Sequence, residues 1–217
     1  MATDSIDDLI ILAADKGIHT TVDALLRHFQ SYSIRKLKYQ ILAKHHMDSD
    51  CYRRAHIVLQ PFVKQFRFAM VFFDRKDCCG KNPKQRESIE RDVEERLFQN
   101  GWQNRAICIA LDPELEIWVW SQSPEVEKAL GWTGKTPPLR QWLVDRKFIA
   151  APNEKPSDPK KAYEEALNAV GKQPSSSFFQ QIASTVSLDR CADPAFLKLK
   201  STLQSWFADE TAIERTP

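Results

Sequence analysis

Short apolar runs alternate with helix-like segments along the first two thirds of the chain. Four segments have the length and composition of strands, at 8–15 (DLIILAAD), 38–44 (KYQILAK), 68–73 (FAMVFF) and 106–111 (AICIAL). These runs are apolar instead of alternating between apolar and polar residues. A strand of this kind is buried on both faces, which is typical of a parallel sheet covered by helices on both sides.

The segments between these runs carry helical patterns. We expect the first helix to follow a turn at Lys16-Gly17 and to be capped by Thr20 or Thr21. Its apolar face consists of Val22, Leu25, Leu26 and Phe29. Further helices are predicted at 52–66 with a break near Pro61, at 83–101 and at 124–130. The alternation predicts an α/β domain with a mostly parallel sheet of about four strands and helices on both faces.

The pattern changes near residue 150. The segment 151–159 (APNEKPSDP) is rich in proline and polar residues and is typical of a connector. Two or three helices are predicted after it, at 160–170, 176–185 and 193–207, the last with Leu197, Leu199, Leu203 and Trp206 on its buried side. We therefore divide the chain into an α/β domain, residues 1–150, and a C-terminal helical extension, residues 151–217, that packs as a cap.

Composition adds the protein class. Of the 217 residues, 42% are hydrophobic and 28% are charged, which is typical of a soluble globular protein. The N-terminal segment MATDSIDDLIILAAD lacks the basic region of a signal peptide, and no apolar stretch approaches the length of a membrane span. We predict a cytoplasmic protein without membrane contact. The five cysteines form no CxxC pair, and we expect them all to be reduced thiols.

Positive charge is concentrated in one part of the chain. Between Ser31 and Arg67 there are eight Lys or Arg residues against two Asp residues, a local net charge of +6, although the whole chain carries only +2. Such a stretch suits the phosphate backbone of a nucleic acid. It is equally consistent with a set of solvated helix faces.

Acidic residues follow three of the predicted strands. The first strand ends at Asp15, the third at Asp74 with Asp77 nearby, and the fourth at Asp112 with Glu114 and Glu116. The carboxyl ends of parallel strands lie at one edge of a sheet, where such folds bind ligands. Carboxylates gathered there repel one another, and a divalent cation resolves the conflict.

We therefore predict a Mg²⁺ or Mn²⁺ site. Its candidate ligands are Asp74, Asp77, Glu114 and Glu116, and Lys16, Arg75 and Lys76 are candidates for binding phosphate. In a strand, Glu114 and Glu116 would face the same side, and only one of them is needed as a ligand. Acids at strand ends also begin turns and cap helices, which is the purely structural alternative. The chain has no P-loop, GxGxxG or GxSxG motif.

The order of these motifs resembles a known family. LAADKGIHTTVDALL, VFFDRKDC and ALDPELEIW follow one another as in the Toprim-like proteins of bacterial phage-defence islands, relatives of the Toprim domain of topoisomerases, primases and overcoming-lysogenization-defect nucleases. The resemblance covers roughly residues 8–130, and the tail segment SLDRCADPAFLKLKSTL is also similar. It implies a compact α/β fold, a role in antiviral (phage) defence and an acidic Mg²⁺ site for phosphodiester cleavage or transfer.

The same resemblance assigns roles to individual residues. Asp15 would take the place of the catalytic acid/base carboxylate, Asp74 would match the first Asp of an Asp-x-Asp pair, and Glu114 or Glu116 would complete the acidic rim. The chain departs from the family at two points. The first acid is usually Glu, and the second Asp of the pair is replaced here by Lys76, with the next acid at Asp77.

Three functions remain open on this basis. In a metal-dependent nuclease, Arg53, Arg54 and the rest of the basic stretch would hold the nucleic acid together with Arg75 and Lys76. The alternative is a non-catalytic subunit that binds partner proteins of a multi-protein defence system. A phosphatase or nucleotide transferase for small molecules would use the same acids.

Overall fold

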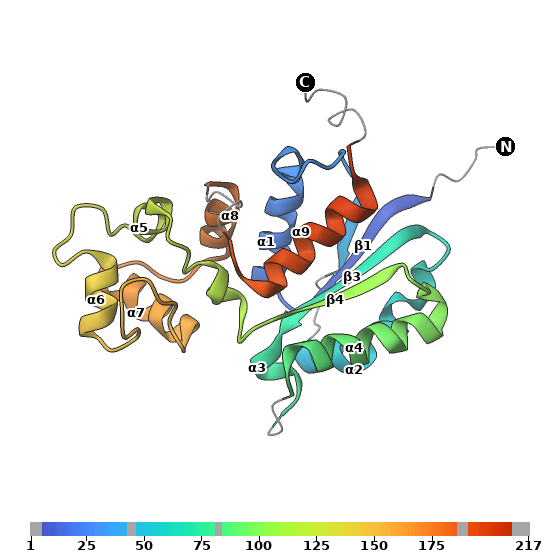
Figure 1. The fold of residues 1–217 in the computed structure, drawn as a ribbon, viewed down its shortest axis with the longest axis horizontal. Coiled ribbons are helices and arrows are strands. Elements are labelled where there is room, and N and C mark those ends of the chain that lie inside the picture. Colours follow the sequence, from blue (N-terminus) through green and yellow to red (C-terminus); the bar gives the residue numbers. More distant parts are fainter. Residues whose placement is uncertain (1–5, 43–46, 81–83, 186–190, 210–217) are drawn as a thin grey trace.

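Four parallel strands form the centre of the fold, in the order β2-β1-β3-β4 (Figure 1). The computed structural model describes residues 6–42, 47–80, 84–185 and 191–209. The strands are β1 (Asp7–Ala13), β2 (Tyr39–Leu42), β3 (Phe66–Asp74) and β4 (Ala106–Leu111). Leu9 of β1 pairs with Tyr39 on one side and Phe68 on the other, so the three amino ends are aligned. The predicted α/β class and parallel sheet are confirmed.

Helices cover both faces of this sheet. Figure 1 shows α1 (Lys16–Arg27) and α9 (Pro194–Phe207) on one face and α2 (Asp48–Leu59) and α4 (Arg86–Leu97) on the other. The residues of β1 from Leu9 to Ala13 are completely buried, and so are those of β3 from Ala69 to Phe73. The apolar runs of the sequence are therefore strands that bury both faces.

A second hydrophobic cluster lies beside the sheet. It joins α5 (Pro124–Leu130), α6 (Leu139–Asp145) and α7 (Pro159–Ala169), at the left of Figure 1, to α8 (Ser176–Thr185), which lies beside α1. This cluster begins at Val119, whereas α9 returns to the sheet, where Trp206 stacks on Phe68 with ring centroids 4.3 Å apart. The domain boundary near residue 150 stays a prediction. Among the described residues, no helix combines the length and the apolar character needed to cross a bilayer.

Three details of the sequence prediction are wrong. Helix α1 begins at Lys16 and not after Thr20, because the Asp15 carboxylate accepts a hydrogen bond from the Ile18 amide at 2.8 Å and caps the helix. Leu197 is 48% exposed, since it lies on the solvent side of α9. Cys78 and Cys79 are joined by a disulfide bond where α3 (Arg75–Cys78) ends, and the free thiols are Cys51, Cys108 and Cys191.

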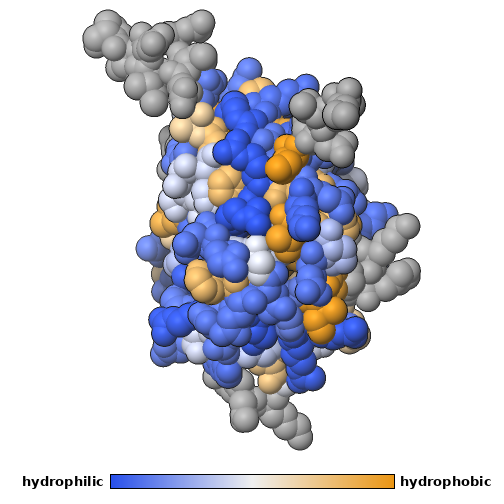
Figure 2. Space-filling view, turned by 90° about the vertical axis from the view of Figure 1, so that its right-hand side faces the viewer, coloured by the Kyte–Doolittle hydropathy of each residue, from blue (hydrophilic) through white to orange (hydrophobic). Residues whose placement is uncertain are grey.

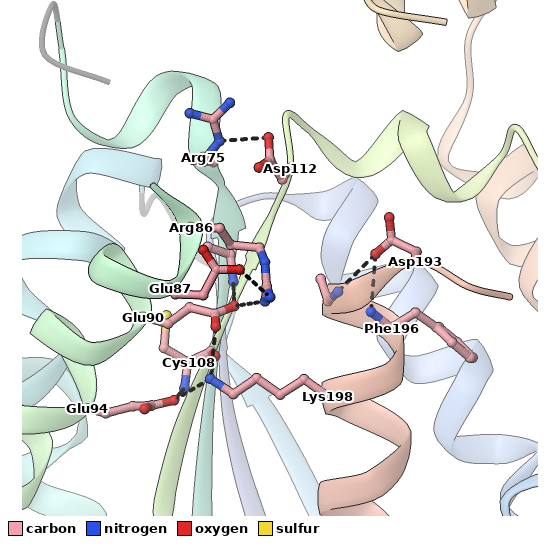
Figure 3. A network of polar contacts seen from close by, with 12 residues as sticks. Arg75, Arg86, Glu87, Glu90, Glu94, Cys108, Asp112, Asp193, Phe196 and Lys198 are labelled. Atoms are coloured by element: carbon pink, nitrogen blue, oxygen red, sulfur yellow. Dashed lines mark hydrogen bonds and ion pairs between the residues drawn. The ribbon is translucent and has the colours of Figure 1, made fainter. Parts of the chain in front are cut away.

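Side chains satisfy the outer edge of β4. The carboxylates of Glu90 and Glu94 accept hydrogen bonds from the amides of Ala110 and Cys108, at 3.0 and 2.9 Å. Lys198 of α9 donates to both carboxylates and to the Cys108 carbonyl, at distances of 2.7–3.0 Å (Figure 3). An unpaired strand edge would recruit other strands. These contacts instead join α4 and α9 around β4.

Candidate metal centre

The carboxyl edge of the sheet gathers acidic residues from four places in the sequence. Asp15 follows β1, Asp48 begins α2, Asp74 ends β3, and Glu114 and Glu116 follow β4. All strands are parallel, so these positions meet at one edge. The predicted convergence of strand-end acids is therefore present in the structure.

Three carboxylates form the centre of this group. One oxygen each of Asp74, Glu114 and Glu116 can be chosen so that all three lie within 4.8 Å of one another. These residues are only 9%, 1% and 9% exposed. We call them the carboxylate triad. Three carboxylate oxygens at this spacing fit a hard divalent cation such as Mg²⁺ or Mn²⁺, which also binds water and phosphate oxygens.

Backbone contacts hold the triad in place. The Asp74 carboxylate accepts a hydrogen bond from the Leu115 amide at 2.9 Å, which fixes the end of β3 against the segment after β4. That segment is the 3₁₀ helix η4 (Leu115–Trp118) and not a strand, so the predicted strand alternation of Glu114 and Glu116 is wrong. Because the short helix begins directly after Glu114, both carboxylates nevertheless reach Asp74.

Burial and mutual repulsion disfavour negative charge in the triad. Burial raises the pKa of Asp74 well above its usual range, and the charges of Asp48, Glu116 and Asp15 raise it further. Burial, with the charges of Glu114 and Asp15, raises the pKa of Glu116 to about 7. Between described residues, no salt bridge includes Asp74 or Glu116. A divalent cation would relieve this repulsion.

Two cations border the triad. Lys76 lies 3.5 Å from a Glu114 oxygen and 3.8 Å from an oxygen of Asp158, the residue that caps α7. The backbone amide of Lys160, at the start of α7, donates to the other Glu114 oxygen at 3.2 Å. Partial burial lowers the pKa of the Lys160 amine, but the charges of Glu116, Glu114 and Asp74 outweigh it, and the pKa is raised.

Two other predicted acids lie outside the triad. Asp15 is exposed at the same edge, where its charge raises the pKa values of Asp74 and Glu116. Asp77 is exposed on α3 and is not one of the three clustered carboxylates. Its negative charge instead contributes to the raised pKa of Asp48, which burial raises first. The acid/base role of Asp15 and the ligand role of Asp77 stay predictions.

The predicted phosphate-binding residues have different surroundings. Lys16 is exposed as the first residue of α1, at the carboxyl edge. Arg75 is engaged by Asp112, with the two atoms 2.7 Å apart (Figure 3). Arg53 and Arg54 are exposed on α2, and the described contacts of the triad do not include them. Lys76 is thus the member of this set that touches the triad directly.

Sequence reasoning missed Asp48 and Lys160. The Asp48 carboxylate accepts a hydrogen bond from the Asp74 amide at 2.8 Å, so it orients the end of β3. Its position in the sequence could have identified it. Asp48 is the first acid after the second strand and begins the next helix, as Asp15 follows the first strand and caps the helix after it. Lys160 carried no comparable signal, since only the packing of α7 brings the helical extension to the triad.

Comparisons of the chain with protein-family models, with curated proteins and with solved structures found no match. The function of the triad therefore has to be inferred from its own chemistry.

Proposed function

We propose that this chain is a metal-dependent nuclease that hydrolyses phosphodiester bonds in nucleic acid. The observation that carries the proposal is the carboxylate triad, in which three nearly buried acids converge without a salt bridge to Asp74 or Glu116 among the described residues. Accumulating buried negative charge is costly unless a cation or a proton neutralises it. The resemblance to Toprim-like proteins adds the expectation of a role in antiviral (phage) defence.

Asp74, Glu114 and Glu116 would hold Mg²⁺ or Mn²⁺. Such an ion, when bound, supplies Lewis-acid chemistry by polarising a phosphoryl oxygen and by lowering the pKa of water. Asp48 supports the centre, because its hydrogen bond to the Asp74 amide fixes the backbone from which that ligand projects. This supporting contact matters since ligands need a fixed orientation.

The remaining chemistry falls to side chains at the edge of the centre. Asp15 is exposed, and its charge raises the pKa values of Asp74 and Glu116; in this proposal it would transfer a proton to or from water. Lys160 is an exposed residue whose amine interacts with the negative charges of Glu116, Glu114 and Asp74, and it would contact the nonbridging oxygens of a phosphate. The helical extension would thus contribute a substrate contact.

The test combines metal binding with cleavage. Wild type, Asp74→Asn and Asp145→Asn are compared by thermal unfolding with Mn²⁺ or Mg²⁺, and by incubation with supercoiled plasmid, single-stranded DNA and RNA. Asp145 is an exposed acid on α6 and serves as the matched control. We expect metal to raise the melting temperature and support cleavage in wild type and Asp145→Asn only. A wild type that neither binds metal nor cleaves any substrate contradicts the proposal.

A second function is favoured by the contacts of Glu114. Both of its oxygens are engaged, one by the Lys160 amide and one by Lys76, so that this acid anchors α7 to the sheet. A structural anchor is what a non-catalytic subunit of a multi-protein defence system would retain. In that case Asp74→Asn would leave binding to a partner protein intact, and no metal-dependent cleavage would be found in wild type.

A further inference from the structure

The amino edge of the sheet carries the cations that the sequence grouped into one basic stretch. Lys36 and Lys38 precede β2, Lys64 precedes β3, and Arg67 is the second residue of β3. The carboxylate triad lies at the opposite end of the same strands. Because β3 has nine residues and a strand rises about 3.3 Å per residue, the two edges are about 26 Å apart.

The four side chains are exposed and available. Salt bridges between described residues include none of Lys36, Lys38, Lys64 and Arg67. The register places Lys38 and Arg67 on either side of Asp8, one strand away in each direction. Asp8 itself is nearly buried and is engaged by Arg35 at 2.9 Å. The acid between the two cations is therefore already neutralised.

A hollow of about 600 Å³ adjoins one of these cations, Lys64. Lys64 lines it together with the carboxamide side chains of Gln60, Gln65, Gln99 and Asn100. Three of these amides use an N–H group inside the protein, at 2.7–2.9 Å, which leaves their carbonyl oxygens as acceptors. Acceptors and donors in one hollow beside a lysine suit the edge of an unpaired base next to a phosphate.

Aromatic surface is available at the same edge. The ring of Phe68 stacks on Trp206, and the Arg67 guanidinium lies 5.8 Å from the centre of the Phe68 ring. Phe68 and Trp206 are both partly exposed. Figure 2 looks at this edge and shows a mostly hydrophilic face with narrow apolar areas. Cations interleaved with aromatic rings are typical of surfaces that bind single strands.

We propose that the amino edge, defined by Lys36, Lys38, Lys64 and Arg67, is a binding surface for single-stranded nucleic acid that is separate from the carboxylate triad. A distance of about 26 Å corresponds to about eight stacked nucleotides at 3.4 Å each. One phosphate cannot touch both edges, so the amino edge would anchor the strand and not position the reacting bond. The proposal does not depend on metal binding.

The experiment uses a fluorescently labelled 12-nucleotide DNA and the full chain in EDTA, which keeps metal chemistry out of the measurement. Binding is followed by fluorescence anisotropy for wild type and two charge-matched double variants. Lys64→Glu with Arg67→Glu changes the amino edge, and Lys135→Glu with Lys147→Glu changes exposed lysines flanking α6. Circular dichroism and thermal unfolding confirm that both variants are folded.

We expect the amino-edge variant to bind at least tenfold more weakly and the control variant to stay within twofold of wild type. The slope of log affinity against log salt should fall by about 1.4 in magnitude, because each lost phosphate contact on a single strand removes about 0.7. Equal weakening in both variants, or no binding by wild type, overturns the proposal. So does competition by polyglutamate as strong as that by unlabelled DNA, which would indicate an acidic protein partner.

The sequence prediction for Arg53 and Arg54 provides a third comparison. A double change to Glu at these two positions removes the same charge from α2. If this variant loses binding and the Lys64 and Arg67 variant does not, the nucleic acid lies on α2 and the amino edge is not its binding surface.

Discussion

Glu116→Gln should make the metal-free protein more stable at neutral and higher pH. Glu116 is 9% exposed, and burial together with the charges of Glu114 and Asp15 raises the pKa of its carboxyl from 4.5 to about 7. A group whose pKa is higher in the folded state stabilises the fold fully below the unfolded pKa. That contribution is lost as the pH rises through about 7. Glutamine resembles the protonated acid and cannot ionise, so the variant keeps this stabilising contribution at high pH.

The magnitude follows from the two pKa values. One pKa unit corresponds to about 1.4 kcal/mol, so a change from 4.5 to about 7 gives an upper limit of about 3.5 kcal/mol. Between pH 5 and pH 8, the wild type should lose about 2.5 kcal/mol of this contribution. Glu116→Gln should therefore gain up to that amount relative to wild type over the same interval.

Urea unfolding in EDTA at pH 5 and pH 8 measures this difference directly. Glu95→Gln, which changes an exposed acid on α4, is the control and should show no such pH dependence. The reasoning is refuted if the difference between Glu116→Gln and wild type is the same at both pH values. Adding Mn²⁺ at pH 8 should stabilise wild type by about 2.7 kcal/mol when the free Mn²⁺ concentration is a hundredfold above the dissociation constant of wild type. The same Mn²⁺ concentration should stabilise Glu116→Gln less.

Three further predictions concern the triad and the β4 edge. Metal affinity should increase as the pH rises through about 7, because Glu116 must lose its proton to become a ligand. Calorimetry at pH 6 and pH 8, in buffers of different ionisation enthalpy, measures the number of protons released on metal binding. Lys160→Ala should bind Mn²⁺ more tightly, since a cation beside the triad is lost, but should raise the KM for nucleic acid. The control is Lys161→Ala, which changes the exposed neighbouring residue and should alter neither quantity. If Lys160→Ala weakens metal binding and substrate binding together, the role of Lys160 is structural. Lys198→Met should lower the free energy of unfolding by about 2 kcal/mol, because Glu90, Glu94 and the Cys108 carbonyl lose a charged donor. Glu90 keeps its ion pair with Arg86 at 2.8 Å, so the loss stays below that of an unpaired buried charge. No measurable loss in urea unfolding would contradict the importance of this network.

The sheet could be predicted because its signal is local. Runs such as AICIAL are apolar at every position, and only a strand buried on both faces requires that pattern. The convergence of Asp15, Asp74 and Glu116 at one edge followed from parallel strand direction alone. In contrast, the η4 turn depends on the Asp74 carboxylate, 41 residues away, which accepts the Leu115 amide. Such a contact leaves no periodic trace in the sequence.

The basic stretch shows the same limit more clearly. Its residues are close in sequence, but β2, α2 and β3 carry them in different directions. Asp48 reaches the carboxyl edge, Arg53 and Arg54 lie along α2, and Lys64 returns to the amino edge. The closeness of these residues in the sequence therefore predicted one basic patch, whereas the fold distributes them over separate surfaces. Only strand direction, combined with the lengths of the intervening helices, assigns each cation to an edge.

The two edges also differ in how a polyanion would approach them. Without a metal ion, the carboxylate triad and its neighbouring acids repel phosphate, and Arg75 is occupied by Asp112. Lys64 and Arg67 are exposed at the other edge, and neither forms a salt bridge with a described residue. A nucleic acid should therefore meet the amino edge first and reach the triad only when a cation has neutralised it. On this reasoning EDTA abolishes cleavage but leaves most of the binding affinity, whereas Lys64→Glu with Arg67→Glu weakens binding in both the presence and the absence of metal.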